Sequence, residues 1–261
     1  MPETIAILEA EVLDHQEVAA EHYVLTLDAP EIAAQARPGQ FVMVRSLGAW
    51  DPLLPRAYSV YHADPEGGTV QILYREVGRG TAALRRNDVG RYVHVWGPLG
   101  NQFRLPEGDR VVLVGGGVGV PPLVYWAQYL HALSVPMEVV ALIGAASAKY
   151  LVGLDHLREA KVLLRAATDD GTFGHKGFVT ELLPQFLKDS RATVYACGPM
   201  GMLAAVSRIA EEHGAPSELA LEAPMACGVG ACIGCTVPKR DGGYFRVCTD
   251  GPVFAGNSIA W

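Results

Sequence analysis

Four of the five cysteines lie close together near the C-terminal end of the chain, in the spacing C-x4-C-x2-C-x12-C. Three fall on one short glycine-rich stretch, and the fourth follows a strand-like segment, Tyr244 to Val247. This spacing is typical of the four thiolate ligands of a plant-type [2Fe-2S] cluster. Glycines between the cysteines allow backbone N–H groups to approach and hydrogen-bond the sulfurs. The predicted cluster ligands are Cys227, Cys232, Cys235 and Cys248.

Zinc is the main alternative for these thiols. Structural zinc sites usually use two short pairs of ligands, whereas here three cysteines share one loop. A disulfide framework is a poor interpretation, because five is an odd number and thiols in the cytosol are normally reduced. Residues 219–261 are too few for a self-sufficient apolar core. We therefore expect the cluster to form the core of this segment, and the segment to unfold locally without iron.

Composition and charge exclude several classes of protein. The chain has 261 residues, against about 150 for a typical domain, which favours more than one domain. Half of the residues are hydrophobic and 19% are charged, as in ordinary globular proteins. Lys and Arg number 21 against 28 Asp and Glu, giving a net charge of −7. Without a basic run, the attraction needed to bind nucleic acid or an anionic membrane is missing.

The chain contains one stretch long enough to cross a bilayer without a charged residue, between Arg110 and Glu138. Its glycines and prolines would leave backbone groups unsatisfied in lipid, so we expect no membrane span. The first residues, Met1 to Thr4, show neither the cationic nor the apolar character of a targeting peptide. We therefore expect a cytoplasmic protein.

The periodicity of the apolar residues changes near residue 105. Before it, short apolar runs separated by turn residues predict about six strands that form a small antiparallel β-barrel. These runs are residues 5–13, 23–27, 41–45, 58–61, 69–74 and 92–95. One helix is expected in this part, over residues 81–87, with Thr81 as its N-cap.

From residue 110 the pattern alternates between strand and helix, which predicts an α/β domain with a parallel sheet. The expected strands are residues 111–114, 137–143, 161–166, 193–196 and 218–221, and the expected helices are 121–133, 179–187 and 199–212. The predicted fold class is thus α+β and multidomain. It comprises an antiparallel β-barrel domain at 1–104, a parallel-sheet α/β domain at 105–218 and an iron-sulfur segment at 219–261.

A glycine-rich loop lies between the first strand and the first helix of the α/β domain. Glycines at this point permit close approach of a pyrophosphate to the N-terminus of the helix. The spacing is not G-x-G-x-x-G, and a turn without a ligand would also favour glycine, so both interpretations stay open. Cys197-Gly198 follows a later strand, at an edge where ligands bind in such domains, although a buried structural cysteine is the alternative. The candidate nucleotide contacts are Gly115, Gly116, Gly117, Gly119, Cys197 and Gly198.

Three short motifs in the barrel part suit a flavin. Arg-Ala-Tyr-Ser at 56–59 offers a cation for phosphate, an aromatic ring and a hydroxyl, and Leu-Tyr-Arg at 73–75 and Gly-Arg-Gly-Thr at 78–81 follow. Taken singly, Tyr58 as an ordinary barrel residue and Arg56 as a surface charge would be the favoured interpretations.

Along nearly the whole chain, the motifs R-x-Y-S, G-x-G-T, GGGVGVPPL and CGPM resemble the ferredoxin-NADP reductase superfamily. The stretch EAPMACGVGACIGC from Glu222, with VCTDGPVF up to Phe254, resembles the electron-transfer subunits of NAD-dependent, class B dihydroorotate dehydrogenases. This resemblance implies the four cluster ligands named above and a set of FAD contacts. The implied FAD contacts are Arg56, Ala57, Tyr58, Ser59, Leu73, Tyr74, Arg75, Gly80 and Thr81. Ala57 departs from the proline that many superfamily members have there.

The resemblance also implies a partner, an FMN-containing catalytic subunit that oxidises dihydroorotate in pyrimidine biosynthesis, in a heterotetramer with two copies of each subunit. Electrons would leave the FMN singly through the [2Fe-2S] cluster, collect on FAD and depart as hydride to NAD. We expect no base for dihydroorotate chemistry in this chain. The alternatives are the small subunit of an NAD(P)H:ferredoxin oxidoreductase or of a sulfhydrogenase, and a binding module without turnover.

NAD is expected in preference to NADP. Residues 144–149, after the second strand of the nucleotide domain, contain no arginine for a 2′-phosphate. Ser147 and Lys149 in this segment are the residues that leave the preference open.

Overall fold

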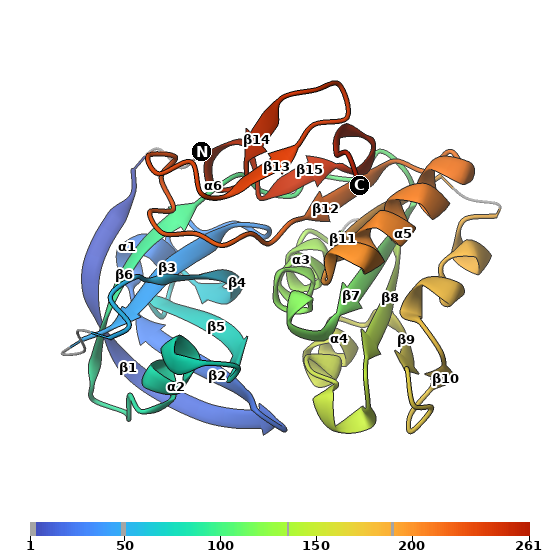
Figure 1. Cartoon of the computed structure of the whole chain (residues 1–261). Coiled ribbons are helices and arrows are strands. Elements are labelled where there is room, and N and C mark those ends of the chain that lie inside the picture. Colours follow the sequence, from blue (N-terminus) through green and yellow to red (C-terminus); the bar gives the residue numbers. More distant parts are fainter. Residues whose placement is uncertain (1–3, 48–50, 135, 189–190) are drawn as a thin grey trace.

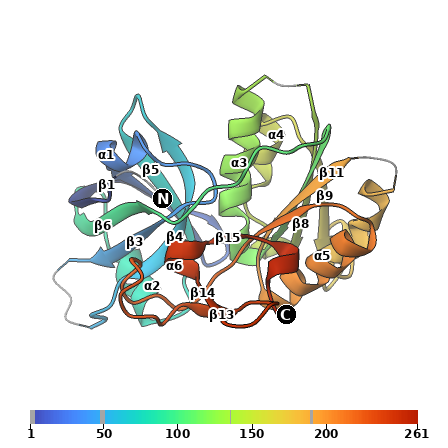
Figure 2. The same cartoon turned by 90° about the horizontal axis from the view of Figure 1, so that it is seen from above.

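The computed structural model describes residues 4–47, 51–134, 136–188 and 191–261. A β-barrel and a parallel sheet lie side by side, and the C-terminal segment extends across one end of both (Figures 1 and 2). Within the described ranges, no helix is long and apolar enough to cross a membrane. Residues 1–3, on which the expected lack of a targeting peptide partly rests, lie outside the described part of the chain.

The predicted six-stranded antiparallel barrel is confirmed, with strand order β1-β2-β5-β4-β3-β6. Its strands are β1 (Ala6–Ala19), β2 (His22–Asp28), β3 (Phe41–Ser46), β4 (Arg56–Asp64), β5 (Thr69–Arg75) and β6 (Tyr92–Leu99). Alternate side chains such as Leu25, Leu27 and Ile72 fill the interior, as the period of two requires. The short helix α1 (Pro30–Ala33) packs against the same interior.

Helix α2 (Arg79–Arg85) forms close to where a helix is predicted, but its cap differs. Gly78 is the N-cap residue, and Thr81 is the third residue of the helix. The Thr81 hydroxyl accepts hydrogen bonds from the N–H groups of Val77 at 2.9 Å and Gly78 at 3.1 Å. The prediction of Thr81 as N-cap is therefore wrong, because a side chain at the third position can reach back to the same unpaired donors.

The second sheet has seven strands in the order β10-β9-β8-β7-β11-β12-β15, and all but β15 run parallel. The strands are β7 (Arg110–Gly116), β8 (Glu138–Ala145), β9 (Leu163–Thr168), β10 (His175–Lys176), β11 (Ala192–Cys197), β12 (Ser217–Ala220) and β15 (Val253–Ala255). Helices α3 (Pro121–Ala132) and α4 (Leu154–Glu159) cover one face, and α5 (Met200–Glu212) covers the other. Because both faces are covered, β7 is apolar on both sides, with Leu113 facing α3 and Val114 facing α5.

The predicted helix at 179–187 is wrong. The chain forms two single 3₁₀ turns there, η3 (Val179–Leu182) and η4 (Pro184–Phe186). Pro184 has no N–H group and its ring clashes with the preceding turn of an α-helix, so a continuous helix cannot pass through it.

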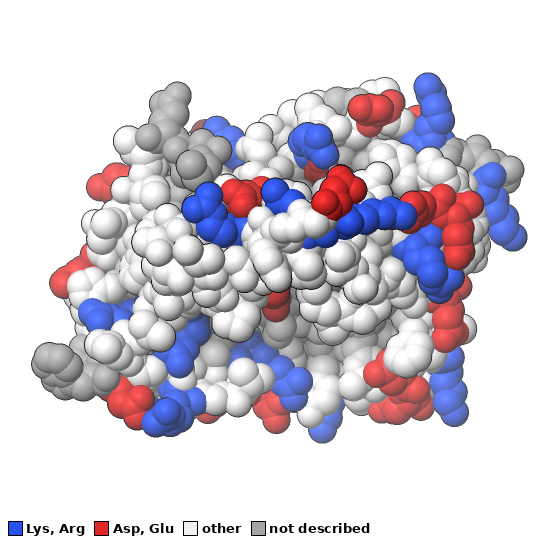
Figure 3. Space-filling view, turned by 45° about the horizontal axis from the view of Figure 1, so that its top comes forward, with Lys and Arg blue, Asp and Glu red and all other residues white. Residues whose placement is uncertain are grey.

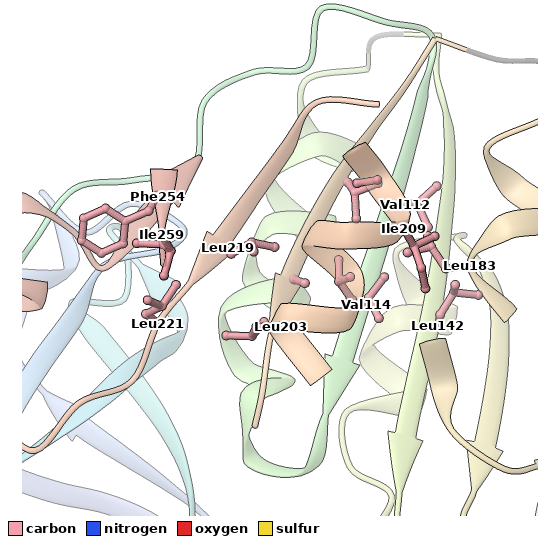
Figure 4. Close-up of a cluster of buried hydrophobic side chains, with 14 of the residues drawn as sticks. Val112, Val114, Leu142, Leu183, Leu203, Ile209, Leu219, Leu221, Phe254 and Ile259 are labelled. Carbon is pink, nitrogen blue, oxygen red and sulfur yellow. The ribbon is translucent and has the colours of Figure 1, made fainter. Parts of the chain in front are cut away.

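The C-terminal segment contributes to the large sheet and shares its core. It contains the hairpin β13 (Thr236–Pro238) and β14 (Tyr244–Arg246), helix α6 (Val247–Asp250), β15 and the turn η5 (Gly256–Ser258). Phe254 and Ile259 extend the row of apolar side chains that begins under α5 (Figure 4). Met43 and Leu99 of the barrel belong to the same cluster. The expectation that the iron-sulfur cluster alone forms the core of this segment is therefore wrong.

Polar contacts fix the barrel against the large sheet on the side of α3. The Tyr61 hydroxyl lies 2.8 Å from His156 Nδ1 of α4. His62 Nδ1 lies 2.8 Å from Gln128 Oε1 of α3. The Tyr125 hydroxyl, also on α3, donates to the Ala36 carbonyl at 3.1 Å. The two β-structures are thus held together along one side, and the space between them opens elsewhere.

Candidate functional site

A cleft of about 1330 Å³ lies between the barrel and the carboxyl-terminal edge of the parallel strands. All three predicted parts of the chain line it: the flavin motifs, the glycine loop and the start of the cysteine segment. The predicted residues that line it are Arg56, Ala57, Tyr58, Ser59, Leu73, Tyr74, Arg75, Thr81, Gly116, Gly117, Gly119, Cys197 and Gly198. Two predicted residues, Gly80 and Gly115, do not face the cleft.

Two tyrosines form an aromatic wall on the barrel side. The rings of Tyr58 and Tyr74 meet edge to face, with centroids 5.9 Å apart. Burial raises the pKa of Tyr58 to about 12, so this ring is neutral at physiological pH and can face an aromatic ligand. Behind the wall, Tyr74 OH bonds His15 Nε2 at 2.9 Å, and His15 Nδ1 bonds the Asn87 carbonyl at 2.9 Å. Sequence reasoning missed His15, because its hydrogen-bond partner Tyr74 lies 59 residues later in the chain.

Gly80 serves the site by leaving space for Arg56. A Cβ atom on Gly80 would overlap the Arg56 guanidinium. The Arg56 side chain therefore passes against the first turn of α2, and its Nη1 donates to the Leu54 carbonyl at 2.5 Å. This arrangement places a cation on the cleft wall, where it can bind a phosphate.

The glycine loop has two roles. A Cβ on Gly119 would overlap the backbone of Cys197 and Gly198, and one on Gly115 would lie 3.1 Å from Ile143 and Val120. Close packing thus requires glycine at 119 and favours a small residue at 115, which is the structural alternative that the sequence left open. Gly117 differs: its φ is +54°, and apart from its neighbours along the chain no atom of the described residues lies within 4 Å of the added Cβ position. Backbone at this point is accessible from the cleft, as a bound pyrophosphate requires.

Cys197 is the last residue of β11, and Glu222 follows two residues after the end of the neighbouring strand β12. Burial raises the pKa of the fully buried Cys197 thiol well above its usual value, so this sulfur is a poor nucleophile. The Glu222 side chain is exposed to the cleft. Protein atoms nevertheless surround its carboxyl group and replace water around it, and this desolvation raises its pKa. Sequence reasoning did not select Glu222 as a site residue. A charged residue directly after a parallel strand was the available signal.

The far end of the cleft is bridged between the barrel and η2 (Ala148–Tyr150) of the nucleotide domain. Arg75 forms a salt bridge with Glu21 at 2.7 Å, and its guanidinium lies 4.7 Å from the centre of the Tyr150 ring. The Ala20 N–H donates to the Lys149 carbonyl at 3.1 Å. The Arg75 side chain is therefore already engaged by protein groups, although the residue lines the cleft.

The four predicted cluster ligands form two pairs. Cys235 and Cys248 are each only 2% exposed, and their Sγ atoms are 3.2 Å apart. In the other pair, the Cys232 N–H donates to Cys227 Sγ at 3.4 Å. Burial alone would raise the pKa of Cys227, but hydrogen bonds from backbone N–H groups, beginning with that of Val229, lower it to about 7. Amide donors around a thiolate are what an iron-sulfur cluster requires of its protein.

The cysteines are arranged as two pairs rather than as four thiols around one point. Among the described residues, no three Cys, His, Asp or Glu side chains form a group that could hold a single metal ion. Two pairs of cysteines instead fit a cluster with two irons, with one pair on each.

Family comparisons assign each part of the chain. The oxidoreductase FAD-binding domain matches residues 9–103, and the oxidoreductase NAD-binding domain matches residues 113–208. The iron-sulfur cluster binding domain of dihydroorotate dehydrogenase B matches residues 222–260. These matches agree with the predicted cofactors, FAD, NAD and an iron-sulfur cluster.

Curated relatives match over almost their full length. The electron-transfer subunit of dihydroorotate dehydrogenase B (NAD(+)) from Desulforamulus reducens is 38% identical, covering 98% of both chains. That of Geobacillus thermodenitrificans is 41% identical, covering 95% of this chain and 96% of the relative.

Solved structures show the same architecture. A chain of the NADH-dependent reduced ferredoxin-NADP oxidoreductase, solved in a study of flavin-based electron bifurcation, is 28% identical. It superposes with a TM-score of 0.87, covering 97% of this chain and 90% of that one. The cytochrome b5 reductase domain of Ulva prolifera nitrate reductase shares the fold at 18% identity, with a TM-score of 0.67 over 82% and 94% of the two chains.

Proposed function

Because the chain belongs to the family of dihydroorotate dehydrogenase B (NAD(+)) electron-transfer subunits, we propose that it conveys electrons from a dihydroorotate-oxidising subunit to NAD. One observation carries the proposal: the flavin motifs, the glycine loop and residues 223–225 line a single cleft. Cys227, the first cluster ligand, follows two residues after the last of these. The relatives at 38% and 41% identity favour this function over that of the ferredoxin-linked alternative, whose solved chain is 28% identical.

In this proposal the residues divide the work as follows. Arg56 binds a flavin phosphate, and the Tyr58 ring faces the flavin. The loop at Gly117 receives the NAD pyrophosphate, and the two cysteine pairs hold the [2Fe-2S] cluster. When bound, FAD exchanges both single electrons and hydride, which couples a one-electron cluster to a two-electron nicotinamide. The boundaries proposed for the three functional parts are 1–104, 105–218 and 219–261.

The proposed partner is an FMN-containing catalytic subunit, in a cytoplasmic assembly of two copies of each chain. Residues 223–238 carry no charged side chain, and two exposed apolar residues, Val229 and Ile233, lie on the cluster loop at 47% and 62% exposure. Charged residues are depleted at the centre of protein interfaces, so this loop suits contact with the partner. Elsewhere on the face that carries the C-terminal segment, charges of both signs are interspersed (Figure 3).

The test of the proposal is to isolate the chain with its partner from the native cell extract and to identify the partner and its flavin. A co-purifying FMN protein that oxidises dihydroorotate is the expected result. Exclusive recovery of a hydrogenase or a ferredoxin-dependent enzyme would refute the proposed function.

Replacing Gly80 by Ala is expected to weaken FAD binding by about tenfold or more. The added methyl group must displace the Arg56 guanidinium, and a hydrogen bond to a charged group is worth ~1.5–3 kcal/mol. Flavin titration of the apoprotein measures the effect. Gly78→Ala is the matched control, because its backbone is extended and, apart from its neighbours along the chain, no atom of the described residues lies within 4 Å of the added Cβ. Equal FAD affinities of the two variants would contradict the role of Arg56.

The preference for NAD over NADP is expected to show as a higher kcat/KM for NADH than for NADPH. Ser147 Oγ lies 3.3 Å from Thr172 Oγ1, and Lys149 Nζ lies 4.8 Å from the centre of the Tyr150 ring, so both groups that could donate a hydrogen bond to a 2′-phosphate already contact protein groups. The carboxylate of Asp169 lines the same cleft and would repel a phosphate. In Asp169→Asn, the kcat/KM for NADPH should rise relative to that for NADH, which brings their ratio closer to one. A wild-type ratio in favour of NADPH would reverse the assignment.

A further inference from the structure

Asn101 binds the C-terminal segment just beyond its last cysteine ligand. It lies after β6, on the linker between the barrel and the large sheet, and its side-chain amide pairs with Val253 of β15. Asn101 Nδ2 donates to the Val253 carbonyl at 2.8 Å, and Asn101 Oδ1 accepts from the Val253 N–H at 2.9 Å. The Asn101 backbone N–H donates to the Gly251 carbonyl at 2.7 Å, and Nδ2 also reaches the Asp250 carbonyl at 3.4 Å.

These bonds place the amide of Asn101 where a further strand would lie. On its other edge, β15 pairs with β12, with Val253 opposite Ala220 and Phe254 opposite Leu219. One polar side chain therefore satisfies both backbone groups of Val253, which would otherwise be left unpaired in a buried position. A neutral amide offers a donor and an acceptor together for this purpose, whereas an ionised carboxylate offers acceptors only.

The linker that carries Asn101 is itself tied to the barrel. Gln40 Nε2 donates to the Gly100 carbonyl at 3.0 Å, in a buried position beside β3. A Cβ on Gly100 would overlap Pro252, and one on Gly39 would lie 3.0 Å from the Val253 side chain. The barrel, the linker and β15 are thus in direct contact, and Cys248 lies five residues before Val253.

We infer that Asn101 is a positioning residue that holds the cluster-bearing segment against the flavin barrel and so sets the rate of electron exchange between them. The inference rests on the proposed function for its two carriers. Electron-transfer rates fall steeply with distance. If the segment is no longer held at Val253, the distance between the cluster and the flavin fluctuates, and electrons pass between them more slowly on average. The role is specific to the amide, because a carboxylate at position 101 would face the carbonyl oxygens of Val253 and Asp250.

The experiment uses the isolated full chain loaded with FAD and cluster, without a partner. In Asn101→Ala, hydrogen exchange at the Val253 amide should accelerate by about tenfold, because an unpaired buried donor is costly. After mixing with NADH, flavin bleaching should keep its wild-type rate, while cluster reduction slows. Asn257→Ala is the matched control: it lies in the same segment, and its side chain has no hydrogen-bond partner among the described residues.

Asn101→Asp supplies a second readout that a general loss of stability would not produce. At neutral pH, hydrogen exchange at the Val253 amide should be as fast in this variant as in Asn101→Ala, and cluster reduction should be as slow. On acidification, the protonated carboxyl regains a donor, and both rates should return toward those of the wild type. Unchanged Val253 exchange in Asn101→Ala, or cluster reduction that is independent of pH in Asn101→Asp, would overturn the inference. Neither result bears on the identity of the partner, so this test and that of the proposed function fail separately.

Discussion

Cys232→Ser is expected to abolish dihydroorotate:NAD turnover of the assembled complex, while NADH reduction of a two-electron dye continues at close to the wild-type rate. The dye takes electrons at the flavin, whereas dihydroorotate-derived electrons must pass the cluster. Cys232 is the exposed member of its pair, so its loss removes a ligand without opening the core that surrounds Cys235 and Cys248. Parallel assays of both reactions on one preparation measure the separation.

Loss of the cluster also alters the loop that is proposed to contact the partner, so complex formation must be measured beside activity. Phe254 and Ile259 anchor the rest of the segment in the shared core, and we therefore expect disorder to be confined to the residues around Cys227 and Cys232. Ile233→Ser, a neighbouring change at an exposed position, should keep the cluster and weaken association alone. Full dihydroorotate:NAD activity from a cluster-free Cys232→Ser complex would exclude the proposed route.

Gly119→Ala is expected to impair NADH oxidation severely and to destabilise the protein by about 1–3 kcal/mol, the usual cost of overpacking. The added Cβ would overlap the backbone of Cys197 and Gly198, so the loops after β7 and β11 must separate. Both loops line the cleft on the nucleotide side. Backbone atoms cannot give way as the end of a flexible side chain can, which makes this change more damaging than Gly80→Ala.

Gly201→Ala is the matched control for this prediction, since Gly201 also lines the cleft but, apart from the neighbouring residues of its own helix, no atom of the described chain lies within 4 Å of the added Cβ. It also lies within α5, where alanine is the better helix former. Urea unfolding and the KM for NADH are measured for both variants. Wild-type stability and KM in Gly119→Ala would show that the two loops are not in contact as described.

Local patterns in the sequence were sufficient to predict much of this fold. The barrel strands follow from alternation of apolar residues, and the parallel strands follow from apolar runs between helices. The four cysteines proposed as cluster ligands were selected from their spacing alone, because three of them share one loop. At 179–187 the apolar pattern predicted a helix, and Pro184 overrode it.

The remaining features depend on contacts between distant residues. Gly80 and Gly115 were predicted as ligand contacts; in the structure their side-chain neighbours include Arg56 and Ile143, which no local pattern connects to them. Strand β15 is only three residues long and gains its pairing from β12. The role of Asn101 depends on Val253, 152 residues later in the chain. Such tertiary contacts leave no periodic signal in the sequence.

Reconstitution from purified subunits tests the central claim most directly. The chain, loaded with FAD and cluster, is mixed with its purified co-isolated partner, and NADH formation from dihydroorotate and NAD is followed by absorbance. We predict that NADH forms only when both subunits are present, and that the partner alone oxidises dihydroorotate with an artificial acceptor but not with NAD. Formation of NADH by the partner without this chain would contradict the account.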